Sequence, residues 1–243
     1  MKFSRCKLMM LTLLAGLSLQ LTAAELVLSG RSAADLKRDL TSKPAETLAL
    51  LPVQPGQQVL DLFGGNGYYS ELIAQLVGPS GKVLLHNNQA YLKFVGDALP
   101  QRLKDGRLPN VVRYDRESDA LGLTPDSLDG VLFVMGYHDF YHKSEGWAVS
   151  RDQVLNQIKT ALKPGGYLLI VDHQAKAGSG HSAAQELHRI DKQDVIAELT
   201  AAGFVLKQQS DVLHNSADDH SLMVFDPAIR GKTDRFTLVF SKP

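Results

Sequence analysis

Residues 59–70 read Val-Leu-Asp-Leu-Phe-Gly-Gly-Asn-Gly-Tyr-Tyr-Ser, and this stretch decides the fold. An apolar run delivers an acid, Asp61, and a glycine-rich loop then leads into a helical pattern. Glycine adopts positive φ angles without a steric penalty, so Gly65 and Gly67 allow a tight turn and let a ligand approach the backbone. In an open α/β sheet, ligands bind in the crevice at the carboxyl ends of the strands. The stretch therefore predicts a buried strand, a ligand-binding loop and a helix.

Outside this loop, strand-like and helical segments alternate along the chain. The expected strands are 58–62, 82–86, 111–114, 130–135, 167–171, 205–210 and 235–240, and the expected helices are 33–51 with a break at Pro44, 69–76, 153–162 and 194–202. Strands separated by helices form βαβ units and therefore a parallel sheet. Only a loop, 214–234, separates the last two strands, so we expect these two to pair as an antiparallel hairpin.

The glycine loop resembles the motif Asp/Glu-x-Gly-x-Gly-x-Gly of the class I S-adenosylmethionine-dependent methyltransferases. Asp61, Gly65 and Gly67 match it position by position, and Phe63 stands where the family has its first glycine. The resemblance implies that the loop wraps the methionine part of the cofactor and that Asp61 helps to hold its amino group. It also implies a Rossmann-like seven-stranded α/β methyltransferase sheet, mostly parallel with a C-terminal antiparallel hairpin. The competing pattern is the nicotinamide dinucleotide fingerprint Gly-x-Gly-x-x-Gly, which Ser70 breaks.

Further matches lie at the ends of the next strands. Residues 81–87 follow the family's Gly-x-Val pattern toward an acid that binds both ribose hydroxyls, but Asn87 occupies that position. An amide can accept one hydrogen bond and donate another, without the strength that a charge adds. Asp115 falls near the family's adenine-contacting acid, with a solvated loop acid as the alternative. Residues 162–166, Leu-Lys-Pro-Gly-Gly, match a turn of structural importance in the family.

In this family the residues just after the fourth strand face the transferred methyl group. Here residues 135–142 read Met-Gly-Tyr-His-Asp-Phe-Tyr-His. A histidine near neutral pH can accept a proton, so His138 is the candidate catalytic base, with Tyr137 lining the same mouth. The alternative is that His138 only hydrogen-bonds the end of the strand.

Five histidines are expected near the carboxyl edge of the sheet: His138, His142, His173, His181 and His188. Such a group could hold a divalent metal ion, as in metal-dependent O-methyltransferases. Those sites are mostly built from carboxylates, however, and no His-x-x-x-His–Glu set with convincing ligand spacing appears in the sequence. We therefore assign no metal ligand.

The N-terminal segment differs from the rest of the chain. Basic residues precede an uncharged, leucine-rich run over residues 8–21, and small residues follow at 22–24. The run is shorter than the ~20 residues needed to span a bilayer, and the small residues suit cleavage after Ala24. We predict a signal peptide over residues 1–24 and a single class I methyltransferase domain over residues 25–243. We therefore expect the protein to be periplasmic or secreted. The alternative is that the segment remains uncleaved as a membrane anchor.

Composition narrows the function further. The only cysteine, Cys6, lies in the leader, so the mature protein would have no thiol for a disulfide or a nucleophile. The formal net charge is +0 at pH 7, without the basic balance that nucleic-acid binding requires. We predict S-adenosyl-L-methionine-dependent methylation of an unidentified small molecule, with no stable membrane span after cleavage. The alternative is an exported, non-catalytic binding protein that retains the fold.

The chain as a whole looks like a group of predicted secreted methyltransferases that share the stretches 137–141 and 226–232. The segment 226–235 is too polar and rich in turn residues to belong to the core. It could fold back over the site or lie on the surface, and we favour a surface loop.

Overall fold

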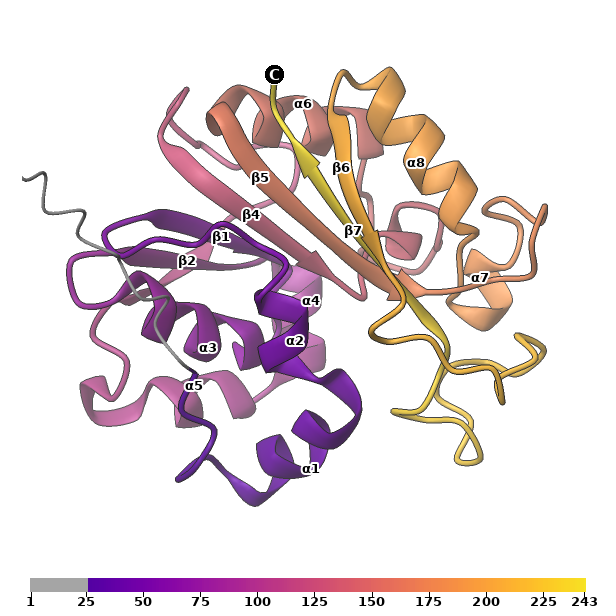
Figure 1. The fold of residues 1–243 in the computed structure, drawn as a ribbon, viewed down its shortest axis with the longest axis horizontal. Coiled ribbons are helices and arrows are strands. Elements are labelled where there is room, and N and C mark those ends of the chain that lie inside the picture. Colours follow the sequence, from indigo (N-terminus) through magenta and orange to yellow (C-terminus); the bar gives the residue numbers. More distant parts are fainter. Residues whose placement is uncertain (1–25) are drawn as a thin grey trace, which may run out of the picture.

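The computed structural model describes residues 26–243, which form one seven-stranded sheet covered by helices on both faces (Figure 1). The predicted signal peptide, residues 1–24, lies outside the described residues. The strands are β1 (Gln58–Leu62), β2 (Lys82–Asn87), β3 (Val111–Asp115), β4 (Leu128–Val134), β5 (Leu162–His173), β6 (Val205–Ser210) and β7 (Arg235–Ser241).

The strand order is β3-β2-β1-β4-β5-β7-β6, and β7 runs antiparallel between β5 and β6. The other neighbouring strands pair in parallel. The predicted sheet, mostly parallel with an antiparallel C-terminal pair, is therefore confirmed. The carboxyl ends of β1, β4 and β5 and the start of β7 meet at one edge, which is the edge where such sheets bind ligands.

The helices are α1 (Ala33–Ser42), α2 (Pro44–Leu48), α3 (Tyr68–Val77), α4 (Gln89–Val95), α5 (Ala98–Leu103), α6 (Arg151–Ala161), α7 (Ala184–Leu187) and α8 (Lys192–Ala201), with short 3-10 turns η1 (Lys104–Gly106) and η2 (His138–Phe140). Helices α1 to α5 lie on one side of the sheet, and α6 and α8 lie on the other (Figure 1). No described helix is both long and apolar enough to cross a membrane.

Two hydrophobic cores fill the two faces of the sheet, and β5 divides its side chains between them. Leu168 and Ile170 pack in the core that includes residues of α6 and α8, whereas Leu169 and Val171 pack in the core that includes residues of α2 and α3. Successive side chains of a strand point to opposite faces, so a strand buried on both faces is apolar throughout.

The predicted break at Pro44 is confirmed, because Pro44 begins α2, where proline fits the first turn of a helix. Two local features differ from the sequence prediction. Strand β5 starts at Leu162, so the Pro-Gly-Gly segment lies inside the strand rather than before it. Helices α4 and α5 were missed because Gly96 separates them and Pro100 interrupts the helical pattern.

Candidate active site

A cavity of about 740 Å³ lies at the carboxyl edge of the sheet. The glycine loop after β1, the segment after β4, the end of β5 and the start of β7 all contribute to its wall. A volume of this size suits a small-molecule ligand. Its lining includes cationic, aromatic and histidine side chains: Arg38, Phe63, Tyr91, Phe94, His138, His142, Trp147, His173, His188, Phe225, Arg230 and Arg235.

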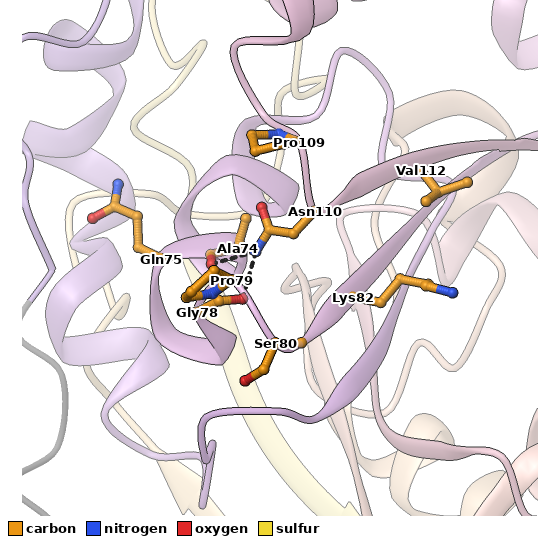
Figure 2. Close-up of a pocket in the computed structure, with 10 residues that line it drawn as sticks. Ala74, Gln75, Gly78, Pro79, Ser80, Lys82, Pro109, Asn110 and Val112 are labelled. Carbon is orange, nitrogen blue, oxygen red and sulfur yellow. Dashed lines mark hydrogen bonds between the residues drawn. The ribbon is translucent and has the colours of Figure 1, made fainter.

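A second hollow, of about 690 Å³, lies at the opposite edge of the sheet, beside the first residues of β2 and β3 (Figure 2). The side chain of Asn110 projects into this region and donates hydrogen bonds to the carbonyl oxygens of Ala74 and Gly78, both at 2.9 Å. These contacts satisfy carbonyl groups at the end of α3, which have no partners within the helix. The side chain of Asn110 therefore has a structural role.

The glycine loop leaves β1 in a conformation that glycine favours. Gly65 and Gly67 have φ angles of 61° and 82°, and Phe63 has a φ of 50°. A Cβ atom on Gly64 would lie 2.6 Å from Oδ2 of Asp61, closer than real Cβ contacts. Gly64 is therefore needed for the loop to pass over the acid, and this requirement accounts for a glycine at a position outside the matched motif.

Asp61 is buried beneath this loop. Its Oδ2 accepts a hydrogen bond of 2.6 Å from the hydroxyl of Ser70 in α3. Burial raises the pKa of Asp61 to about 6, although the hydrogen bond from Ser70 lowers it. Ser70, which breaks the dinucleotide fingerprint, is thus the partner of the motif acid.

Asn87 holds the glycine loop rather than lining the cavity. Its Oδ1 accepts a hydrogen bond from the backbone N–H of Gly65, and its Nδ2 donates one to the carbonyl oxygen of Gly65, both at 2.9 Å. The side chain is completely buried. An aspartate could accept from the N–H but could not donate to the carbonyl, so the amide matches both backbone groups of Gly65.

Asp115 ends β3 beside Asn87, with which it is in register. Its Oδ2 accepts a hydrogen bond of 2.5 Å from Nε of Arg113. Its Oδ1 is buried, and no hydrogen-bond partner for it exists among residues 26–243. Asp115 is not among the residues that line the cavity, but a buried carboxylate oxygen without a partner is costly, so this oxygen can still accept a hydrogen bond.

Aromatic rings form one side of the cavity. The ring of Phe63 lies 5.6 Å from that of Tyr91 and 5.3 Å from that of Trp147, and Tyr91 lies 6.2 Å from Phe94. Phe94 is 78% exposed at the edge of this group. Such rings offer flat apolar faces for the stacking of planar ligands.

His138 is fixed between two carboxylates at the turn after β4. Nδ1 of its ring lies 2.8 Å from Oδ1 of Asp172, and Nε2 lies 3.2 Å from Oδ1 of Asp139. Burial lowers the pKa of His138, but the charge of Asp172 and the hydrogen bonds to both carboxylates raise it to about 10. The ring is therefore protonated near neutral pH in this arrangement, so a role as base would first require the loss of that proton.

Tyr137, predicted to line the same mouth, faces the core instead. Its side chain is completely buried, and its hydroxyl donates a hydrogen bond of 2.8 Å to Oε2 of Glu198 in α8. Within a 3-10 turn, neighbouring residues point in different directions, so His138 and Tyr137 diverge.

The five histidines expected near this edge divide into two groups. His138, His142, His173 and His188 line the cavity. His181 stacks on the ring of Tyr141, with centroids 4.1 Å apart, and is not part of the lining.

The segment 226–235 folds back over the site, so the preference for a surface loop was wrong for part of it. Arg230, Gly231 and Thr233 line the cavity, and Nδ1 of His173 lies 2.7 Å from the hydroxyl of Thr233. The segment is polar because it forms part of a cavity wall. A cavity wall and a surface loop both expose polar side chains, so composition alone does not distinguish them.

A buried ion pair that was not predicted from the sequence holds the loop between β6 and β7. Arg189 is completely buried, and its guanidinium binds both carboxylate oxygens of Asp218 at 2.9 and 3.0 Å. It also donates to the carbonyl oxygens of Leu222 and Gln174. Nothing in the local sequence distinguishes Arg189 from an exposed arginine, because its acceptors come from distant segments.

The strand order and the glycine loop define the class I methyltransferase fold. Solved structures agree, at sequence identities that address the fold alone. A methyltransferase from Aquifex aeolicus, described as S-adenosylmethionine dependent, aligns with a TM-score of 0.63 and 19% identity over 85% of this chain and 93% of its own. A [4+2]-cyclase aligns with a TM-score of 0.57 and 21% identity over 87% of this chain and 82% of its own.

The family model described as the ubiE/COQ5 methyltransferase family matches residues 39–218, so the chain belongs to that family. The ubiquinone/menaquinone biosynthesis C-methyltransferase of Hahella chejuensis is 29% identical over 149 residues, covering 61% of this chain and 56% of the relative. The protein of the same name from Pseudomonas paraeruginosa is 31% identical over 143 residues, covering 58% and 52%. The chain spans about half the length of these curated relatives.

Proposed function

We propose that this protein is an S-adenosylmethionine-dependent methyltransferase and that its acceptor is a small aromatic molecule. One observation carries the proposal: the glycine loop of the family motif and the segment after β4 open into the same cavity. A methyl donor on the loop and an acceptor against that segment would therefore lie in one cavity. Methyl transfer depends strongly on such positioning.

The residues that would hold the cofactor fit it. Gly64 and Gly65 present their backbone at the cavity wall, with Asp61 beneath them. Asp115 has a buried carboxylate oxygen without a partner among residues 26–243. Phe63 offers an aromatic face beside the loop. When bound, the cofactor supplies an electrophilic methyl group on a sulfonium.

Two further residues of the predicted cofactor site act on the loop itself. Gly67 immediately precedes α3 and has a positive φ, so it sets the direction in which the helix leaves the loop. Asn87 fixes Gly65 through both backbone groups and thus prearranges the loop without touching the ligand. The residue at the family's ribose-binding position would then contribute indirectly.

The acceptor side combines aromatic faces with fixed positive charge. Tyr91, Trp147 and Phe225 line the cavity and suit a planar acceptor, and Arg38 and Arg230 suit one that carries a negative charge. The curated relatives bear the name of quinone-biosynthesis C-methyltransferases, and an aromatic acceptor would be consistent with that chemistry.

Calorimetric titration with S-adenosylmethionine and with its demethylated product tests the proposal. We expect both to bind, and we expect Asp115→Asn to weaken binding by about tenfold or more, because a hydrogen bond to a charged group is lost. Asp119→Asn, at an exposed position nearby, is the matched control. Absence of binding of either ligand at millimolar concentration contradicts the proposal, and a panel of phenols and hydroquinones then tests transfer.

We also propose export of the protein through the signal peptide at residues 1–24. The basic residues at its N-terminus, the uncharged apolar run and the small residues before the expected cleavage position support this proposal. Fractionation of cells that express the full chain, with mass measurement of the product, should find a periplasmic or secreted form that begins at Glu25. A cytoplasmic protein of full mass would contradict it.

A further inference from the structure

Two histidines and one carboxylate meet at one point of the cavity wall. Nε2 of His138 lies 3.2 Å from Oδ1 of Asp139, and Nδ1 of His188 lies 3.8 Å from the same oxygen. The three candidate ligand atoms all lie within 4.8 Å of one another. Ligands that share an ion at ~2.0–2.2 Å lie ~3–3.5 Å apart, so side-chain shifts of about an ångström would bring this set to coordination distance.

We propose that His138, Asp139 and His188 bind a divalent first-row transition-metal ion whose remaining coordination positions face the cavity. The ion site stands independently of methyl transfer, and only its use for an acceptor rests on the proposed function. This proposal replaces the sequence-based assignment of no metal ligand, which relied on spacing within one segment. His188 is distant in sequence from the other two residues and joins them only in the fold.

The surroundings of His138 match those of a metal ligand. Asp172 accepts at 2.8 Å from Nδ1 and, through its other oxygen, at 2.9 Å from the backbone N–H of the same residue. The carboxylate also accepts from the backbone N–H of His173 and is completely buried. Metal-bound histidines commonly donate their second ring nitrogen to a carboxylate, which fixes the ring orientation. Here that contact leaves Nε2 directed at Asp139, and a bound ion would take the place of the proton that Nε2 carries without it.

His188 is held in a strained position beside the same point. It follows the last residue of α7 with a φ of 54°, a left-handed conformation that costs ~1–2 kcal/mol for a residue with a Cβ atom. Such strain is retained where the surrounding structure enforces it, often at functional sites. Its ring packs at 5.3 Å from that of His138 and at 5.2 Å from that of Phe225.

His142 provides an independent observation that points to a ligand. Its Nδ1 is buried, yet it has no hydrogen-bond partner in the part of the chain that the structure describes. The ring lies 4.4 Å from the ring of His188 and lines the same cavity. A buried ring nitrogen without a partner costs free energy, and a fourth metal ligand or a metal-bound molecule would satisfy it.

The donor atoms indicate the kind of ion. Imidazole nitrogens with one carboxylate suit zinc, iron(II) and their neighbours, whereas magnesium and calcium prefer sets of oxygen ligands. Residues 26–243 contain no cysteine, so thiolate ligation plays no part. Two histidines and one carboxylate leave positions open, and an acceptor oxygen or a water molecule can occupy them.

A second cluster, His181 with Asp194 and Glu198, is the rival site. Nδ1 of His181 lies 3.6 Å from Oδ2 of Asp194, and both side chains are substantially exposed. The carboxylate of Glu198 already accepts hydrogen bonds from Tyr137 and Tyr141 and pairs with Arg151 at 2.9 Å. A carboxylate that is already neutralised is a poor metal ligand, so the cavity cluster is favoured.

Cobalt(II) titration of the metal-stripped full-length chain tests the proposal, because the visible absorption of cobalt reports nitrogen and oxygen ligation. We expect one ion per chain, and a loss of affinity of at least ~100-fold in His188→Ala, since even partners of ligands contribute ~10–100-fold. Asp139→Asn should weaken binding similarly. His181→Ala is the matched control and should bind as wild type, with thermal unfolding confirming that each variant is folded.

Two results would overturn the metal site: no stoichiometric cobalt binding by wild type, or binding lost in His181→Ala and kept in His188→Ala. Calorimetry of the metal-stripped chain with the demethylated cofactor product separates this outcome from a failure of the proposed function. Cofactor binding without cobalt binding rejects the metal alone, and cobalt binding without cofactor binding rejects the methyltransferase alone.

Discussion

The two halves of the cavity are built in different ways. The glycine-loop half is local, since Asp61, Gly64 and Ser70 lie within one strand–loop–helix unit. The histidine half combines the turn after β4, the end of β5, the end of α7 and the loop before β7. A local unit can be fixed by a few backbone requirements, whereas the second half depends on packing that brings distant segments together.

The same contrast extends to electrostatics. In the glycine-loop half, Asp61 is buried with only a hydroxyl partner, and its pKa is raised to about 6. In the histidine half, Asp172 faces the ring of His138, and Asp218 faces the guanidinium of Arg189. Asp61 therefore has a hydroxyl partner and only the more distant charge of Arg38, whereas Asp172 and Asp218 each contact a basic side chain directly.

The largest expected effect is on the histidine half, from Arg189→Ala. Removal of the guanidinium leaves Asp218 buried without its partner, which costs about 3–5 kcal/mol of unfolding free energy. Chemical denaturation followed by circular dichroism measures this loss. Arg230→Ala, on an exposed side chain of the same loop, should change stability by no more than ~0.5 kcal/mol. Equal losses in both variants would show that the ion pair does not hold the loop.

Asp61→Asn addresses the glycine-loop half and should be stabilising. The pKa of Asp61 is about 6 in the folded protein against 3.8 for a free aspartate, so the unfolded chain releases this proton first as pH rises. Ionisation therefore weakens folding between about pH 4 and pH 6. Relative to wild type, the variant should gain up to ~3 kcal/mol above pH 6 and nothing below pH 4.

The measurement is the difference in unfolding free energy between variant and wild type across this pH range, with exposed Asp119→Asn as a control that should show no trend. Cofactor affinity should fall in Asp61→Asn, because the predicted partner of the amino group loses its charge. A variant whose relative stability fell as pH rose would mean that Asp61 has a compensating positive partner.

The contrast between the two halves also explains what the sequence could predict. Asp61, Gly65 and Gly67 were identified because they match the family motif within one short segment, and the alternation of strands and helices predicted the sheet. His188 could not be assigned, since its neighbours His138 and Asp139 lie in the turn after β4. Arg189 could not be assigned either, since Asp218 lies in the loop before β7. The cavity-lining role of Arg230 and Thr233 was missed for the same reason.

Asn87 illustrates a further limit of pattern matching. Its position in the motif predicted a ligand contact, but the side chain binds both backbone groups of Gly65. A pattern places a residue at the end of a strand, and the direction of its side chain follows from neighbours that the pattern does not include. Motif position and side-chain role therefore have to be established separately.

The smallest effect is expected from Tyr137→Phe, which tests whether this residue belongs to the site or to the core beside it. Loss of its hydrogen bond to Glu198 should lower the unfolding free energy by about 1.5 kcal/mol, while Tyr141 and Arg151 still satisfy that carboxylate. Tyr114→Phe is the matched control for loss of a tyrosine hydroxyl, because it removes a hydrogen bond to the carbonyl oxygen of Leu121. If Tyr137 transferred a proton in the reaction, kcat would fall ~10²–10⁴-fold in the phenylalanine variant. If Tyr137 is only a core residue, kcat stays within about twofold of wild type. We expect the second result, because the hydroxyl is directed at α8 and not at the cavity.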